Sequence, residues 1–342
     1  MFNDKTILIT GGSGSWGQEL TSQLLEKYSP KKIKIYSRNE PKQITMKRDF
    51  KNNPKLKFVI GDIRDYNRLD EVCYDVDYIF HLAVLKHFYI CEENVGEAIK
   101  INILGTQNII KAAIKNSIKK VIYISTDKAV EPLNLYGLTK AIGEKLIITA
   151  NNSTKNTSFV CVRAGNVLGT SESVIPVFRK QILDINKITI TNGEMTRFFL
   201  NLKQAISLIF KASMDSIGGE IFIVPMPAVK IDDLADLMIK ELGNEQTEKI
   251  IIGKRSGEKD HELLVSKEES QRTFKVGNYF LILPSMEIEK IKKHYDTRLL
   301  QKVEFKEYSS KNTRRLSSEE IKEMLDNENW LAKEKTSTDV FV

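Results

Sequence analysis

The amino-acid sequence predicts an α/β protein: a doubly wound parallel sheet followed by a smaller C-terminal α/β domain. Two observations favour this fold class. Short runs rich in β-branched and aromatic residues recur along the first half of the chain, and helical patterns separate most of them. This alternation is typical of βαβ units, whose strands pair in parallel. The expected strands are 5–10, 32–37, 56–61, 77–82, 119–125 and 157–163.

A glycine-rich turn connects the first two expected strands. Its glycines lie between a strand and a helical pattern. There they permit a tight turn, let backbone N–H groups approach a pyrophosphate at the helix N-terminus, and let helix and strand pack closely. This context favours a dinucleotide site over a tight loop without a ligand. The predicted contacts are Gly11, Ser13, Gly14, Ser15, Trp16 and Gly17.

The ends of the second and third strands indicate which dinucleotide binds. Where an NAD site offers an acidic residue to the ribose, this chain has Ser37 and Arg38. A guanidinium can pair with a 2′-phosphate, which favours NADP over NAD; the alternative is a solvated loop arginine. Asp62 and Ile63 follow the third strand, where a carboxylate can accept from the adenine amino group or can cap the next helix.

The segment after the fifth strand carries an acid, two amines and a phenol. Tyr136 and Lys140 are four residues apart, so on a helix they share a face and the ammonium can lower the pKa of the phenol. Asp127 and Lys128 form a second set, for which the alternative is a surface ion pair or a loop cap. Acid/base pairs with perturbed pKa values cluster at functional sites. The predicted catalytic residues are Thr126, Asp127, Lys128, Tyr136 and Lys140.

Bulk composition excludes several classes of protein. The chain has 342 residues, of which 41% are hydrophobic and 28% charged, as in an ordinary globular enzyme. Its net charge of +7 comes from scattered lysines, so we expect no nucleic-acid partner. No apolar run suits a membrane helix, and a strand begins almost at Met1, which predicts a cytoplasmic protein. Three cysteines without a spacing pattern predict neither disulfides nor a metal site.

Motifs along the chain resemble one family of enzymes. Thr-Gly-x-x-Gly-x-x-Gly at 10–17 and Tyr-x-x-x-Lys at 136–140 resemble the extended short-chain dehydrogenase/reductases. Narrower motifs resemble the inverting UDP-N-acetylglucosamine 4,6-dehydratases of bacterial polysaccharide and nonulosonic acid biosynthesis, over residues 1 to about 315. These motifs are Leu85-Lys86-His87, Ser125-Thr126-Asp127-Lys128-Ala129, Asn134-Leu135-Tyr136-Gly137, Met195-Thr196-Arg197-Phe198 and Gly257-Glu258-Lys259.

The resemblance implies an NADP-binding Rossmann domain over 1–165, a substrate domain over 166–330 and a tail over 331–342. The chain could return to the Rossmann domain over about residues 195–225. The resemblance also implies a homo-oligomer that pairs through helices near 98–115 and 137–151. The further cofactor contacts would be Leu82, Ala83, Lys86, Tyr136 and Lys140. The contacts to the sugar nucleotide would be Lys86, His87, Asn166, Val174, Arg197, Arg255 and Glu258.

The implied reaction is a dehydration of UDP-N-acetylglucosamine to a 4-keto-6-deoxy sugar, with inversion at C5 and internal recycling of NADP. Tyr136 would take the C4 hydroxyl proton during oxidation, while Thr126 binds the C4 oxygen. Lys128 would remove the C5 proton, and protonated Asp127 would protonate the departing C6 hydroxyl. The alternatives are an epimerase that uses only Tyr136 and Lys140, or a non-catalytic NADP-binding sensor.

The chain departs from the family's motifs at positions near the sugar and the nucleotide. These departures are Leu82-Ala83-Val84, Phe88-Tyr89, Ala164 and Thr170-Ser171-Glu172. They leave open the nucleotide, the N-acyl sugar and the end product, and the sequence also leaves the oligomer size open.

Overall fold

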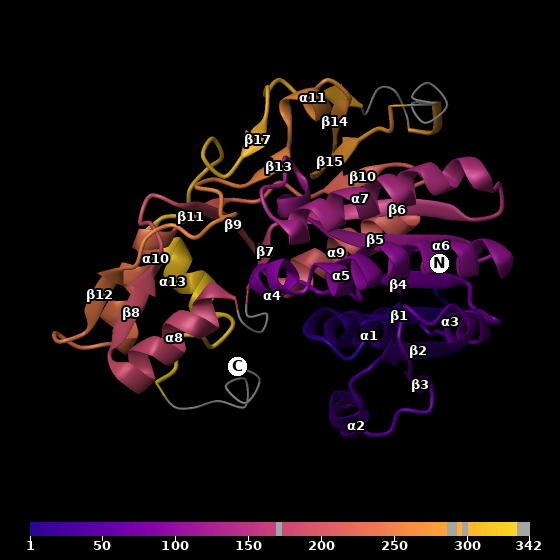
Figure 1. Ribbon diagram of the computed structural model, residues 1–342, viewed down its shortest axis with the longest axis horizontal. Coiled ribbons are helices and arrows are strands. Elements are labelled where there is room, and N and C mark those ends of the chain that lie inside the picture. Colours follow the sequence, from indigo (N-terminus) through magenta and orange to yellow (C-terminus); the bar gives the residue numbers. More distant parts are fainter. Residues whose placement is uncertain (169–172, 286–292, 296–299, 334–342) are drawn as a thin grey trace. The chain divides into compact units, whose positions relative to one another are not determined.

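The computed structural model describes residues 1–168, 173–285, 293–295 and 300–333, and the chain divides into two compact units. The first unit comprises Met1–Ala164, Lys203–Pro225 and Ser266–Lys306. The second comprises Gly165–Leu202, Met226–Val265 and the chain from Glu307 onward. The chain therefore passes between the units several times (Figure 1).

The first unit is built on one sheet, whose described strands run in the order β16-β14-β15-β10-β6-β5-β4-β1-β2-β3. From β3 to β10 all neighbours are parallel, whereas β15, β14 and β16 join antiparallel. The order from β3 to β6 is that of a Rossmann fold (Figure 1). The bounds are β1 (Thr6–Thr10), β2 (Lys32–Ser37), β3 (Leu56–Ile60), β4 (Tyr78–His81), β5 (Lys120–Thr126), β6 (Ser158–Ala164), β10 (Ile221–Ile223), β14 (Thr273–Val276), β15 (Tyr279–Ile282) and β16 (Gln301–Lys302).

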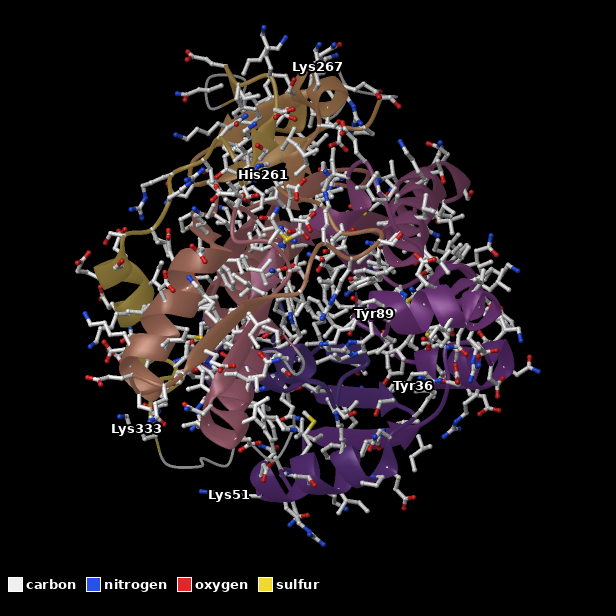
Figure 2. All side chains as sticks on the ribbon, turned by 60° about the vertical axis from the view of Figure 1, so that its left-hand side comes forward. Tyr36, Lys51, Tyr89, His261, Lys267 and Lys333 are labelled. Carbon is white, nitrogen blue, oxygen red and sulfur yellow. The ribbon has the colours of Figure 1, made fainter. Side chains whose placement is uncertain are left out.

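Helices connect these strands and bury apolar stripes against the sheet. Leu20 and Leu24 of α1 and Ile206 of α9 pack into one core with Ile7 and Ile9 of β1. Charged side chains such as those of Lys51 and Lys267 extend from the surface of this unit (Figure 2). The helices are α1 (Ser15–Lys27), α2 (Glu40–Asp49), α3 (Tyr66–Cys73), α4 (Phe88–Glu93), α5 (Val95–Ala98), the π-helix η1 (Ile99–Leu104), α6 (Gly105–Lys115), the 3₁₀ turns η2 (Asp127–Ala129) and η3 (Asn151–Ser153), α7 (Leu135–Ala150), α9 (Leu202–Asp215) and α11 (Lys267–Ser270).

The second unit packs three helices around a separate apolar core. Phe178 of α8, Met238 of α10 and Leu325 of α13 meet in this core. Its described strands form three small sheets, β11-β9-β7, β12-β8 and β13-β17. The bounds are β7 (Asn166–Val167), α8 (Val174–Ile185), β8 (Lys187–Ile190), β9 (Thr196–Leu200), β11 (Ala228–Lys230), α10 (Ile231–Leu242), β12 (Glu248–Ile251), β13 (Leu263–Val265), β17 (Tyr308–Ser309) and α13 (Ser318–Asp326).

The predicted fold class is confirmed, but one segment lies elsewhere than the sequence placed it. Residues 266–306 were expected in the second domain, yet β15 pairs antiparallel with β10, which itself pairs with β6. The segment therefore extends the sheet of the first unit, because strand pairing over so long a sequence separation leaves no local pattern. Residues 334–342 of the expected tail lie outside the described residues. In the described ranges, no helix is long and apolar enough to cross a membrane.

Candidate active site

The glycine turn after β1 is packed too tightly for side chains. Gly11 has a φ of +67°, and a Cβ placed on it would lie 2.8 Å from the backbone nitrogen of Ala83. A Cβ on Gly17 would collide with the carbonyl oxygen of Gly12. Gly14 precedes α1 without a side-chain cap, so backbone N–H groups remain at the helix N-terminus. The turn forms a cradle suited to the phosphates of a dinucleotide.

The other predicted residues of this turn tie it to its surroundings. Ser13 Oγ donates to Ser37 Oγ at the end of β2 (2.9 Å). Ser15 opens α1, and Trp16 packs against the core of the first unit. Leu82 follows β4, where its N–H donates to the carbonyl of Thr10 (3.1 Å). The structure thus brings the turn, the end of β2 and the loop after β4 together.

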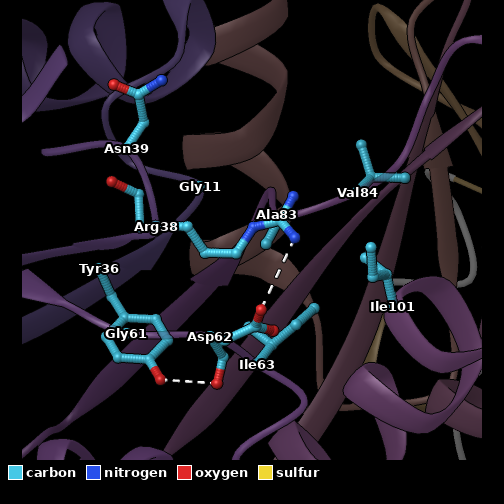
Figure 3. A pocket seen from close by; sticks show the side chains of 11 residues that line it. Gly11, Tyr36, Arg38, Asn39, Gly61, Asp62, Ile63, Ala83, Val84 and Ile101 are labelled. Atoms are coloured by element: carbon cyan, nitrogen blue, oxygen red, sulfur yellow. Dashed lines mark hydrogen bonds and ion pairs between the residues drawn. The ribbon is translucent and has the colours of Figure 1, made fainter. Parts of the chain in front are cut away.

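A cavity of about 180 Å³ opens beside this turn (Figure 3). Among the predicted cofactor residues, it is lined by Gly11, Ser37, Arg38, Asp62, Ile63 and Ala83. Tyr36, Asn39, Gly61, Val84 and Ile101 complete the lining. The walls come from the carboxyl ends of β1, β2, β3 and β4, which is where open α/β sheets bind their ligands.

Charge in this cavity is concentrated on Arg38 and Asp62. The Arg38 guanidinium lies 3.6 Å from the Asp62 carboxylate (Figure 3). Arg64, outside the cavity lining, donates to the same carboxylate at 2.7 Å. Burial raises the pKa of Asp62, but the hydrogen bonds and charge of Arg64 and the charge of Arg38 lower it below its ordinary value. Asp62 is therefore ionised at neutral pH. It does not cap α3, because the cap is Asp65.

The predicted catalytic residues lie at the end of β5, on η2 and in the first turns of α7. Asn134 caps α7 by accepting from the N–H of Gly137 (2.8 Å). A Cβ on Gly137 would collide with the carbonyl oxygen of Lys128 and lie 3.0 Å from Pro132 Cβ. Glycine at this position lets α7 approach η2 closely. This packing brings the Asp127–Lys128 turn and Tyr136 together.

Asp127 lies at the centre of a buried acid/base set. Its side chain is fully buried, and Oδ1 accepts from Thr126 Oγ1 and from Lys128 Nζ, both at 2.9 Å. Within the described part of the chain, Oδ2 has no hydrogen-bond partner. A buried carboxylate oxygen without a partner is costly to maintain and is available to exchange a proton with a ligand.

Tyr136 and Lys140 do not interact in the way the sequence predicted. Burial raises the pKa of Tyr136 to about 12, and the cation that lowers it is Lys128, together with a hydrogen bond between Tyr136 and Thr126. Lys140 Nζ instead donates to the carbonyl of Ile124 (2.6 Å) and lies 3.8 Å from the centre of the Tyr123 ring. Burial lowers the pKa of Lys140 to about 7. The expected lowering of the Tyr136 pKa by Lys140 is therefore absent, because the ammonium binds elsewhere and burial dominates.

Asn102, which no sequence motif marks, is a buried residue of η1 that connects two parts of the site. Its side chain accepts from the N–H of Leu85 (2.8 Å) and donates to the carbonyl of Leu85 (3.0 Å). It also donates to Thr139 Oγ1 (2.9 Å), which donates to the carbonyl of Tyr136 (2.8 Å). Asn102 thus holds the loop after β4 against the start of α7. A π-helix has no periodicity signal, although such turns are frequent at functional sites.

The remaining predicted contacts lie in two places. Lys86 is exposed in the loop after β4, and His87 directly precedes α4. The other five belong to the second unit: Asn166 in β7, Val174 at the start of α8, Arg197 in β9, and Arg255 and Glu258 after β12.

Within the second unit, Arg197 is largely engaged by the protein itself. Its Nη1 donates to the carbonyls of Thr196 (2.8 Å) and Asp260 (3.1 Å), and its Nε lies 3.9 Å from a carboxylate oxygen of Glu262. Arg255 and Glu258 are brought together by a hydrogen bond from the Arg255 N–H to the Glu258 carboxylate (3.2 Å). Thr170, Ser171 and Glu172, where the chain departs from the family's motif, lie outside the described residues.

Comparisons with known proteins show the family to which the chain belongs. The polysaccharide biosynthesis protein family matches residues 7–284. The chain is 45% identical to an inverting UDP-N-acetylglucosamine 4,6-dehydratase of Campylobacter jejuni, over 84% of this chain and 85% of that protein. It is 42% identical to a UDP-glucose 4-epimerase of Rickettsia bellii, over 98% and 99% of the two chains. The structure of Pen from Bacillus thuringiensis superimposes with a TM-score of 0.90 at 37% identity, covering 97% of this chain and 100% of that one. The chain therefore belongs to the polysaccharide biosynthesis protein family, with the fold of the extended short-chain dehydrogenase/reductases.

Proposed function

We propose that this protein is a sugar-nucleotide 4,6-dehydratase, a lyase that converts UDP-N-acetylglucosamine to a 4-keto-6-deoxy sugar nucleotide with inversion at C5. The observation that carries the proposal is Asp127, a fully buried carboxylate paired with Lys128 and holding one unpartnered oxygen within the described chain. Elimination of water needs an acid and a base in addition to the groups that serve oxidation at C4. The name of the Campylobacter jejuni relative, an inverting UDP-N-acetylglucosamine 4,6-dehydratase, supports this substrate and this outcome.

The first unit has the features that a dinucleotide requires. The glycine turn leaves a cradle that any Cβ would fill, and the adjacent cavity suits an adenosine. Ser37 and Arg38 at its mouth favour NADP, because the Arg38 guanidinium can leave Asp62 and pair with a 2′-phosphate. When bound, the nicotinamide would supply a reversible acceptor for hydride.

The contact between Asp127 and Lys128 prepares the elimination step. Transfer of one proton across the 2.9 Å contact converts an ammonium and a carboxylate into an amine and a carboxylic acid. These are the two forms that the step needs, since the amine can remove the C5 proton and the acid can protonate the departing C6 hydroxyl. Tyr136 would receive the C4 hydroxyl proton as a phenolate, a form that the charge of Lys128 favours against burial, and the hydroxyl of Thr126 lies beside it to bind the same oxygen.

Mass spectrometry of UDP-N-acetylglucosamine incubated with the purified protein and NADP tests this proposal. A product lighter by one water is the expected result, and an isomer of unchanged mass would contradict it. No turnover with NADP retained would point to a sensor. In deuterated water the product should carry deuterium at C5, whereas a product without it would contradict the role of Lys128.

Epimerisation is the second candidate function, because the Rickettsia bellii relative is named a UDP-glucose 4-epimerase. An epimerase of this fold would use Tyr136 and Lys140 and would have no chemical task for Asp127. The two functions therefore differ in their dependence on one side chain.

We also propose that the protein forms a homo-oligomer through the side of the first unit that carries α4, α5, η1 and α7. Exposed apolar side chains gather on these neighbouring elements: Tyr89, Ile90, Val95, Ile99, Leu138 and Ile142, which we call the helical apolar face. Large exposed apolar patches mark protein interfaces. A cytoplasmic location stays a prediction.

A further inference from the structure

Arg163 forms a largely buried ion triad that the proposed reaction does not use. The side chain lies at the end of β6 and is 1% exposed. Its Nε and Nη2 donate to the two Glu144 oxygens at 3.0 and 2.6 Å. Its Nη1 and Nη2 donate to the two Glu269 oxygens, both at 3.0 Å. One guanidinium thus holds two carboxylates in paired geometry.

Glu269 orients this guanidinium from a fixed position. It belongs to the capping box of α11, where its carboxylate accepts from the N–H of Ser266 (3.1 Å) and its own N–H donates to Ser266 Oγ (3.2 Å). Burial raises the pKa of Glu269, but Arg163 lowers it to about 2, so this carboxylate stays charged. With one edge of the guanidinium held by Glu269, the other edge faces Glu144.

Stability alone is a poor explanation for such a triad. Burying three charges carries a large desolvation penalty, and apolar replacements of buried ion triads are often equally or more stable. The position of Glu144 suggests a different reason. It follows Lys140 by four residues on α7, the spacing at which a lysine and a glutamate pair on a helix. Yet among the described residues no ion pair joins Lys140 to Glu144, because Arg163 occupies both carboxylate oxygens.

We propose that Arg163, oriented by Glu269, is a positioning residue that holds Glu144 away from Lys140 and so keeps the Lys140 ammonium available to the reacting groups. The inference rests on the proposed function, and it assigns Lys140, a predicted catalytic residue, to the oxidation at C4. The other groups around Lys140 are Tyr123 on β5, Cys161 on β6 and His81 on β4. Glu144 is the carboxylate in this set, and its charge raises the pKa of Lys140 against the effect of burial.

Two double variants of equal charge separate this role from a merely structural one. R163M/E144Q and R163M/E269Q each remove the guanidinium and one carboxylate, and each leaves one buried carboxylate. Only R163M/E269Q leaves that carboxylate one turn from Lys140. We expect Lys140 to titrate about 1 to 3 pH units higher in R163M/E269Q, because an opposite charge at close range favours the ammonium. In R163M/E144Q it should titrate close to the wild-type midpoint.

The titration is measured by NMR of protein labelled with ¹³C-lysine, with the Cε resonance of Lys140 assigned from its absence in K140M. Equal Lys140 midpoints in the two double variants would overturn the proposal. If either variant fails to fold, R163Q/E144Q and R163Q/E269Q replace the pair, because the glutamine amide fills part of the guanidinium's space and can donate hydrogen bonds.

A second readout is the rate at which bound NADP is reduced after UDP-N-acetylglucosamine is added. NADP reduction should be at least about tenfold slower in R163M/E269Q than in R163M/E144Q, because Lys140 paired with Glu144 no longer takes part in proton transfer. The NMR comparison needs no turnover, so the two hypotheses can fail separately. A wild-type protein that leaves the substrate unchanged would refute the proposed function, while the midpoints still decide the role of Arg163.

Discussion

At the scale of single residues, burial moves the two family acid/base groups in opposite directions. It raises the pKa of Tyr136 to about 12 and lowers that of Lys140 to about 7. The phenol is therefore neutral at pH 7, while Lys140 is close to its midpoint. Positive charge near Tyr136 comes from Lys128, which also pairs with Asp127. The acid/base set and the phenol are thus electrostatically coupled, so that a change of charge at Asp127 also changes the pKa of Tyr136.

Replacing Asp127 by asparagine should separate oxidation from elimination. Asparagine keeps the size of the side chain and can accept the hydrogen bonds of Thr126 and Lys128, but it cannot deliver a proton to the C6 hydroxyl. We expect dehydration to fall by at least about a hundredfold, the usual value of general acid/base catalysis. The nicotinamide absorbance on substrate addition should still report oxidation at C4. Unchanged formation of an isomer by D127N would instead support the epimerase.

Replacing Arg38 by alanine should lower the affinity for NADP more than that for NAD. The lost charge-assisted hydrogen bonds to a 2′-phosphate correspond to about ten- to hundredfold in dissociation constant. R64A is the matched control, because Arg64 also pairs with Asp62 but does not line the cavity. Titration calorimetry with both dinucleotides measures the ratio. An equal loss for NAD and NADP in R38A would argue that Arg38 is a solvated loop residue.

The low pKa of Lys140 predicts a pH dependence of stability. Between pH 7 and 10.5 the unfolded lysine is protonated while the folded one is not, so the unfolded state binds more protons and folding stability rises with pH. The free energy of unfolding of the wild-type protein should therefore increase relative to that of K140M by about 1.4 kcal/mol per pH unit within this window. Urea unfolding of both proteins across the window measures the difference. A difference independent of pH would show that Lys140 is protonated in the folded protein.

At the scale of elements, local sequence patterns predicted the strands and helices but not the tertiary contacts between them. The strand and helix alternation and the glycine turn predicted the parallel sheet from β1 to β6, because each strand carries its own apolar run. The Tyr-x-x-x-Lys spacing placed Tyr136 and Lys140 on one helix, as observed. It did not predict that Lys140 would bind the carbonyl of Ile124, because that contact depends on how α7 packs against β5.

Three further residues show which signals the sequence contains and which it lacks. Glu144 continues the four-residue spacing of Tyr136 and Lys140, so the Tyr-x-x-x-Lys-x-x-x-Glu pattern could have been noticed. Glu269, the second carboxylate bound by Arg163, lies 125 positions after Glu144 on a different element, and no local pattern links the two. Asn102 is hidden for a different reason, since its role depends on a π-helix that periodicity does not reveal.

The packing of α7 on η2 predicts a strong effect of one methyl group. In G137A the new Cβ would collide with the carbonyl oxygen of Lys128, a backbone atom that cannot move without displacing the catalytic turn. We expect a loss of about 1 to 3 kcal/mol in the free energy of unfolding, together with loss of dehydration. G96A is the matched control, because a Cβ on this residue of α5 meets nothing within 4 Å.

In G96A we expect no loss of stability and a gain of up to about 1 kcal/mol, since alanine restricts the unfolded chain. Urea unfolding and product formation are measured for both variants. A G137A protein with wild-type stability and activity would show that α7 does not need to lie so close to η2.

At the scale of the whole molecule, each compact unit is formed by more than one segment of the chain. Residues 203–225 and 266–306 return to the first unit and contribute β10, α9, α11 and the antiparallel extension of the sheet. Neither unit is therefore a continuous stretch of sequence. The sequence allowed for a return to the first unit over about 195–225, but not for the one over 266–306. Glu269 belongs to one returning segment, so the environment of the catalytic helix depends on chain that the sequence assigned to the other domain.

The helical apolar face predicts an assembly that one charged substitution disrupts. Leu138 and Ile142 lie one turn apart on α7 and are 47% and 44% exposed, and Val95 and Ile99 repeat this spacing on α5 and η1. In I142E a carboxylate would have to be buried at the interface without a partner, so the oligomer should dissociate. I251E is the matched control, because Ile251 is 69% exposed on β12 of the second unit. Sedimentation velocity at several concentrations should show a smaller species for I142E alone. A single species that is unchanged in both variants would place the interface elsewhere or exclude an oligomer.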